Sequence, residues 1–82
     1  MPKNAEGKSF VVGTKQTLKL MQEGSLTEVF LAEDADLFVT KEIEELASEK
    51  EIQITKVESM KKLGKQFGIS VGAAAAGLLK EI

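Results

Sequence analysis

Residues 9–24 read SFVVGTKQTLKLMQEG, and this stretch sets the fold because a short β-prone run passes directly into an amphipathic helical pattern. The first four residues predict a strand that stops at Gly13. Thr14 is a suitable N-cap for a helix that runs to Glu23 and is closed by Gly24. On a helical wheel, the side expected to be buried carries Thr17, Leu18, Leu20 and Met21.

The same strand-to-helix order recurs twice along the chain, and a final segment follows it. The expected elements are a strand over 27–32, a turn over 33–36, a helix over 37–50, a strand over 52–57, a helix capped by Ser59 and ended by Gly68, and a tail over 72–79. The alanines of the tail favour a helix on intrinsic propensity, whereas its place in the alternation favours a fourth strand. The pattern predicts an α/β layered protein in which helices cover a four-stranded sheet. We expect one domain over residues 1–82, with residues 1–8 as a loose arm or a short helix.

The apolar residues of the helices identify the expected core. The inward faces are predicted to carry Val39, Ile43, Leu46 and Ala47 in the second helix, and Met60, Leu63 and Phe67 in the third. The chain has no Trp or Tyr, and core positions are expected for its four aromatic residues, Phe10, Phe30, Phe38 and Phe67. A stacking platform for bases is therefore not expected. Base contacts would come from polar groups and from apolar loop residues such as Val57 and Met60.

Composition excludes several classes of protein. The 82 residues include 11 Lys and 13 acidic residues but no Arg, His or Cys, for a net charge of −2. Without Cys or His there is no disulfide, thiolate zinc site, thiol nucleophile, Ser–His pair or imidazole metal ligand. The run from Val71 to Leu79 is far shorter than the ~20 residues that span a bilayer. No signal peptide is visible, so a cytoplasmic location away from membranes is expected.

Candidates for catalysis are weak. Glu33, Asp34 and Asp36 could form a metal or acid–base cluster, but acids at this place are equally typical of a turn and a helix start. The calcium-loop spacing is absent, and Gly13-Thr-Lys lacks the spacing of a phosphate-binding loop. We therefore expect no enzyme activity, no catalytic residue, no metal and no cofactor.

Charge is distributed unevenly along the chain. Residues 33–51 hold eight acids against two Lys, a net charge of −6, so the remainder carries +4. The basic residues nearest to predicted helix starts are Lys15, Lys19, Lys61, Lys62 and Lys65. Such polarity can orient a protein on a polyanion, although two solvated helix faces of opposite sign would give the same numbers.

The junction after Gly13 suits an RNA groove. There the first N–H groups of the helix are expected at its positive dipole end, beside Lys15, Gln16 and Lys19. The N–H groups and lysines can bind phosphates, and the Gln amide can read a base edge. Loops at one end of a layered α/β sheet come together, so the Gly13 loop and the loop over 57–60 are expected to form one surface.

Three landmarks occur in order along the chain. They are GTKQTLK from Gly13, AEDAD from Ala32, and LGKQFG from Leu63 with VGAAAA from Val71. No single landmark is specific, but the ordered set resembles the kink-turn-binding ribosomal protein superfamily of the L7Ae and L30e type. The closest resemblance is to its small bacterial members, and it covers about Phe10 to Leu79.

The resemblance implies a three-layer α/β/α sandwich with a mixed four-stranded sheet, in which residues 72–79 form a strand. It also implies a monomer that binds kink-turn RNA, where a bulge bends the duplex beside tandem sheared G·A pairs, in a ribosome or a regulatory RNA. The residues that map onto the groove-contacting motif are Gly13, Thr14, Lys15, Gln16 and Lys19. Those that map onto the loop covering the bulge are Val57, Glu58, Ser59 and Met60, with Lys61 and Lys62 beside it.

One departure from the family pattern concerns selectivity. The archaeal branch carries Asn-Glu where this chain has Lys15-Gln16, so Gln16 keeps a carbonyl acceptor for a guanine edge but lacks its charge. The acidic tract is expected to form an outer helix that faces away from RNA. An alternative function is a protein-interaction module that docks a basic partner on the acidic helix face of Glu42, Glu45 and Glu49.

Overall fold

The computed structural model describes residues 9–80. Along the chain the elements are β1 (Phe10–Val12), α1 (Thr14–Gln22), β2 (Leu26–Ala32), α2 (Leu37–Lys50), β3 (Gln53–Val57), α3 (Met60–Gln66) and β4 (Ala75–Leu79). The three predicted helices and the first three predicted strands are confirmed, with ends shifted by single residues at most. The expected arm over residues 1–8 lies outside the described residues.

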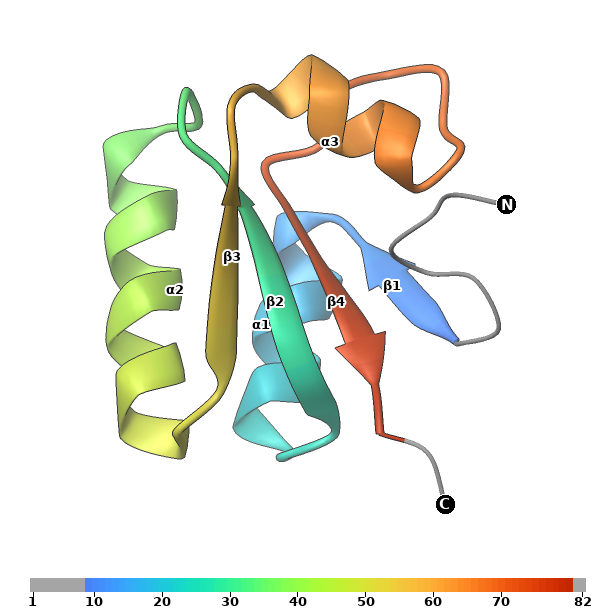
Figure 1. The fold of residues 1–82 in the computed structure, drawn as a ribbon. Helices are drawn as coiled ribbons and strands as arrows, with labels where there is room; N and C mark the ends of the chain where they lie inside the picture. Colours follow the sequence, from blue (N-terminus) through green and yellow to red (C-terminus); the bar gives the residue numbers. More distant parts are fainter. Residues whose placement is uncertain (1–8, 81–82) are drawn as a thin grey trace.

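The strands form one mixed sheet in the order β1-β4-β2-β3. β2 pairs with β3 in parallel, whereas β4 runs antiparallel to both β1 and β2. Figure 1 shows α1 and α2 along one face of the sheet and α3 on the other. The predicted three-layer α/β/α sandwich is therefore confirmed. Within residues 9–80, no helix has the length and apolar character needed to cross a membrane.

Each face of the sheet has its own hydrophobic core. The core under α1 and α2 consists of Met21, Leu26, Val29, Leu31, Ile43, Ala47 and Ala75. The core under α3 consists of Phe30, Ala32, Val57, Leu63, Phe67, Ala73, Ala76 and Leu78. Phe67 is central to the second core because its ring centroid lies 4.9 Å from that of Phe10 and 5.3 Å from that of Phe30. Tilted and edge-on aromatic pairs at these distances add to the stabilisation that burial provides.

The alanine-rich tail forms a strand against its helical propensity. β4 begins at Ala75, three residues later than the predicted strand, and lies between β1 and β2 in the sheet. Its small side chains suit this central place, because a methyl group added at Gly77 would lie 2.6 Å from Cδ1 of Leu26. Ladder hydrogen bonds and burial on both faces outweigh a propensity difference of less than about 1 kcal/mol per residue.

The prediction that all four Phe residues lie in the core is wrong for Phe38. Its side chain is 86% exposed, next to Leu37, which is 79% exposed. Phe38 lies on the outer stripe of α2 that continues through Glu42 and Glu45, whereas Ile43 lies on the buried face. The helical period, rather than the aromatic character of the residue, decides its exposure.

Met60 is the second apolar residue that the structure places at the surface. The helical pattern predicts an inward side chain beside Leu63 and Phe67, but Met60 is 37% exposed, whereas the other two are buried. Met60 is the first residue of α3, so it lies at the end of the helix rather than over the centre of the sheet. Part of this residue is therefore available to a ligand.

Candidate nucleic-acid interface

Three strand ends meet at one edge of the sheet. β1 and β2 are both antiparallel to β4, and β2 is parallel to β3, so β1, β2 and β3 all run in the same direction. Their carboxyl ends, and the loops that lead into α1, α2 and α3, therefore lie at the same edge, the upper one in Figure 1. Both loops predicted to bind RNA are at this edge.

The N-terminus of α1 is open to a ligand. The predicted N-cap, Thr14, is the first residue of the helix, and the N-cap is Gly13. Gly13 has φ 115° and ψ 147°, a backbone conformation that other residues rarely adopt, and it has no side chain to occupy the first N–H groups. No side chain in the described part of the chain caps this helix, and its first turn contains no acidic residue. Both features favour an anion.

The polar residues of α1 surround this open end. Lys15, Gln16 and Lys19 are exposed, and Lys19 lies one turn after Lys15 on the same ridge. Thr14 is half-buried, and Thr17 is fully buried on the opposite side of the helix. The predicted division of α1 into a buried side and an exposed basic side is confirmed.

The loop between β3 and α3, residues 58–59, is built differently because side chains cap the N-terminus of α3. Ser59 is the N-cap of α3, as predicted, and its Oγ accepts a hydrogen bond from the backbone N–H of Lys62 at 3.1 Å. The backbone N–H of Met60 donates to Asp34 Oδ1 at 2.8 Å. These side chains bind the first N–H groups of α3, whereas the corresponding N–H groups of α1 have no side-chain partner within residues 9–80. This loop therefore offers a preformed surface rather than an empty anion site.

The four residues predicted to cover a bulge separate into buried and exposed ones. The Val57 side chain is 7% exposed and belongs to the core under α3, so it presents little surface to a base, and the predicted contact stays a prediction. Its carbonyl accepts a hydrogen bond from Glu33 N–H at 2.8 Å. Glu58 and Met60 are exposed, and Ser59 is half-buried.

Basic residues extend this loop along α3. Lys61, Lys62 and Lys65 are exposed, and Lys62 Nζ lies 2.6 Å from Glu58 Oε2. The hydrogen bond from Lys62, together with its positive charge, lowers the pKa of Glu58 below its usual value. The carboxylate is therefore ionised at neutral pH, and it lies within the surface predicted to bind RNA.

Three consecutive alanines connect the two loops; we call residues 73–75 the alanine bridge. Ala73 N–H donates to the Met60 carbonyl at 3.0 Å, at the start of α3. The Ala75 carbonyl accepts from Gly13 N–H at 2.8 Å, at the start of α1. Between them, the Ala74 carbonyl accepts from Ala32 N–H at 2.9 Å, at the end of β2. Since three residues reach at most about 10 Å, the bridge fixes the two loops side by side.

The acidic tract begins at this edge, in part contrary to the prediction that it faces away. Glu33, Asp34 and Asp36 are exposed in the loop before α2. Two of them cap helices: Asp34 binds the N–H of Met60, and Asp36 Oδ1 accepts from Phe38 N–H at 2.8 Å. Sequence reasoning missed the role of Asp34, because its partner lies 26 residues further along the chain.

Comparison with known proteins identifies the family. Residues 1–81 match the ribosomal protein L7Ae/L30e/S12e/Gadd45 family. The chain belongs to this family. It is 51% identical over 70 residues to the RNA-binding protein YbxF of Geobacillus stearothermophilus, a match that covers 85% of each chain. It is 46% identical over 77 residues to an RNA-binding protein of Bacillus pumilus, a match that covers 94% of each chain.

Solved structures share the fold. The Giardia lamblia 15.5kD RNA binding protein superposes with a TM-score of 0.82 at 23% identity, over 89% of this chain and 62% of that one. A protein of unknown function from Bacillus halodurans superposes with a TM-score of 0.79 at 24% identity, over 87% of this chain and 71% of that one. At these identities the likeness concerns the fold alone.

Proposed function

We propose that the protein is a non-enzymatic binder of kink-turn RNA that stabilises the kinked form. The N-terminus of α1 enters the groove at the tandem G·A pairs, and the loop over residues 58–59 covers the extruded bulge. Membership of the family and the names of two relatives, both RNA-binding proteins, support RNA as the ligand class. Such a protein would act as a monomer in the cytoplasm, bound to ribosomal or regulatory RNA.

The observation that carries this proposal is the uncapped N-terminus of α1 beside the alanine bridge. Backbone N–H groups at that end, with Lys15 and Lys19, suit phosphates, which fix position without reading sequence. Gln16 is exposed in the same turn and can exchange a hydrogen bond with a guanine edge. Met60 lies across the bridge, where an apolar side chain can contact an unstacked base.

Lysine substitutions test the phosphate part of this function. Lys15→Ala and Lys19→Ala should each weaken binding to a kink-turn RNA and flatten the plot of log affinity against log salt by about 0.9 for each phosphate that is no longer neutralised. Lys41→Ala and Lys50→Ala, on α2, are the matched controls and should change neither quantity. Equal losses of affinity in the α2 variants, measured by titration at several salt concentrations, would show that the RNA surface is assigned wrongly.

Gln16→Ala tests the base-reading part separately. This variant should lose discrimination between G·A and Watson–Crick pairs while its salt dependence stays at the wild-type value, because no charge is removed. Loss of salt dependence without loss of discrimination would instead place Gln16 among the residues that only contact phosphates.

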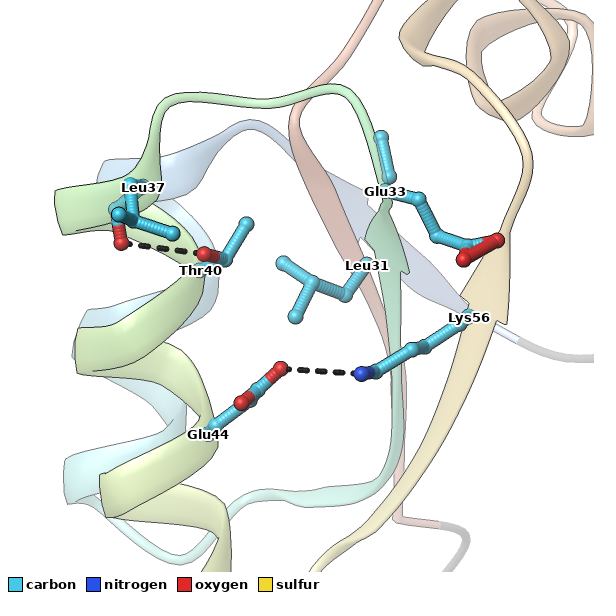
Figure 2. Close-up of a pocket in the computed structure, with 7 residues that line it drawn as sticks. Leu31, Glu33, Leu37, Thr40, Glu44 and Lys56 are labelled. Atoms are coloured by element: carbon cyan, nitrogen blue, oxygen red, sulfur yellow. Dashed lines mark hydrogen bonds and ion pairs between the residues drawn. The ribbon is translucent and has the colours of Figure 1, made fainter.

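A second candidate function is the docking of a basic protein on α2. The exposed Leu37 and Phe38 form an apolar patch at the start of this helix, and Glu42 and Glu45 lie beside Phe38. Figure 2 shows Leu37 at a hollow between α2 and β3, in which Lys56 Nζ lies 3.3 Å from Glu44 Oε1. Lys41 also lies beside Phe38, so the patch has two carboxylates and one lysine around it. Exposed apolar residues with carboxylates beside them suit a partner with Lys or Arg beside an apolar anchor.

The two candidates are separated by one pair of titrations. Phe38→Ser is expected to leave RNA affinity unchanged under the kink-turn proposal, because the residue is on the acidic helix. The docking function instead requires that Phe38→Ser weakens the binding of a probe peptide of alternating Lys and Leu. That function also requires the wild-type protein to bind a kink-turn RNA and the same RNA without its G·A pairs with equal affinity.

A further inference from the structure

An ion pair lies within the proposed RNA surface. Glu58 Oε2 accepts a hydrogen bond from Lys62 Nζ at 2.6 Å, and the two side chains are 75% and 60% exposed. Glu58 immediately precedes the N-cap of α3, and Lys62 lies four residues later on the helix. Both charges can therefore be approached by a ligand at this edge.

Among the α3 lysines, Lys62 alone has an acidic partner within the described residues. The only other salt bridge found there joins Lys56 to Glu44, on the side of α2. Lys61 and Lys65 are exposed and lie outside both pairs. Glu58 thus acts on one specific lysine of the basic cluster.

The pair affects RNA binding more than it affects folding. An exposed salt bridge contributes little to stability. Binding to a nucleic acid, however, depends on how many phosphates the protein neutralises. Lys62 can bind a phosphate only by leaving or sharing Glu58, and the carboxylate then stays close to the polyanion. For an RNA that offers phosphates alone, Glu58 cancels about one positive charge.

A bulge offers this carboxylate hydrogen-bond donors that are already paired in a duplex. Unstacked bases expose their Watson–Crick edges, where adenine, cytosine and guanine carry exocyclic amino donors. A carboxylate accepts hydrogen bonds from such donors, as acidic side chains do from cytosine in DNA grooves. Glu58 lies in the loop assigned to the bulge, so an amino group there can replace Lys62 and release it to a phosphate.

We propose that Glu58 is a specificity-determining residue that masks Lys62 until an unpaired base with an exocyclic amino group takes the place of the lysine. This inference rests on the proposed function, because it uses the loop over residues 58–59 as the cover of the bulge. The negative charge of Glu58, within a basic surface, would then determine which bulge base is preferred. Uridine, which has no amino group, is then the least suitable bulge base.

Glu58→Gln tests the proposal on two RNAs, a plain duplex and a kink-turn with an amino-bearing bulge base. The variant should bind the duplex more tightly, because Lys62 becomes free to bind a phosphate. Between ~50 and ~200 mM salt, its duplex affinity should also fall about three- to fourfold more than that of the wild type. Affinity for the kink-turn should not rise, so the ratio of kink-turn affinity to duplex affinity should decrease.

Four control variants show whether the gain in duplex affinity depends on Lys62. Lys62→Gln alone should weaken duplex binding, because it leaves the Glu58 carboxylate uncompensated beside the polyanion. Glu58→Gln with Lys62→Gln should lose the gain of Glu58→Gln and bind the duplex with an affinity near the wild-type value. Lys65→Gln should weaken duplex binding, since that lysine is outside both ion pairs. Glu49→Gln, on the outer face of α2, also removes one negative charge and should change the affinity for neither RNA.

Two results would overturn the proposal. An unchanged duplex affinity in Glu58→Gln would show that Lys62 is not masked, and equal gains on duplex and kink-turn would show simple repulsion without selectivity. Failure of the proposed function looks different: the wild-type protein would bind both RNAs equally. In that case the duplex titrations of Glu58→Gln and Lys62→Gln would still decide whether masking occurs.

Discussion

Thr17 places a hydroxyl group in the interior of the molecule. The residue is fully buried on the inner side of α1, and its Oγ1 has no hydrogen-bond partner among the described residues. A buried polar group without a partner costs about 1–3 kcal/mol. Thr17→Val replaces the hydroxyl by a methyl group of similar size and should raise the free energy of unfolding by about 1 kcal/mol. In a protein of this size that corresponds to a rise in Tm of about 4–8 °C, measurable by thermal unfolding.

Thr40 is the matched control for this change. Its hydroxyl donates to the Leu37 carbonyl at 3.0 Å, so Thr40→Val removes a hydrogen bond that is made and should not stabilise the protein. A loss of stability in Thr17→Val would show that the hydroxyl is satisfied in solution. The hydroxyl of Thr17, unpaired among the described residues, and the exposure of Phe38 both depend on which residues pack around them, and the sequence alone does not identify those neighbours.

At the scale of elements, the two helices of the site differ in how their N-termini are satisfied. α1 begins at a glycine and keeps its first N–H groups free, whereas α3 begins between Asp34 and Ser59, which cap it. The sequence predicts the Ser59 cap, because it is local, but it favours Thr14 rather than Gly13 as the cap of α1. The cap from Asp34 depends on the meeting of two strand ends, which no local pattern contains.

Asp34 provides the prediction that belongs to this scale. Asp34→Ala removes the acceptor for Met60 N–H and should weaken kink-turn binding about fivefold, the equivalent of one hydrogen bond. Asp34→Asn keeps an Oδ1 acceptor and should retain tighter binding than Asp34→Ala. Both variants remove the same negative charge, so their difference reports the hydrogen bond alone. Amide hydrogen exchange at Met60 should accelerate in Asp34→Ala but not in Asp34→Asn, and equal exchange in both would contradict this role.

At the scale of the whole molecule, the alternating strand and helix pattern predicts the layers well. Three parallel strands necessarily bring their following loops to one edge, which is why two basic segments over 40 residues apart are expected on one surface. The tail is ambiguous from local propensity, and only its central place in the sheet makes it a strand. The alanine bridge, which fixes the distance between the loops, becomes visible only in the assembled fold.

We propose that this edge of the sheet recognises the kinked RNA rather than RNA in general. The most direct measurement is a pair of dissociation constants at one salt concentration, for a kink-turn RNA and for the same RNA with its two G·A pairs replaced by Watson–Crick pairs. Each wrong pair in a specific site costs about 1–3 kcal/mol, so the kink-turn should bind at least about thirtyfold more tightly. Equal affinity for the two RNAs would show that the protein does not recognise the kink.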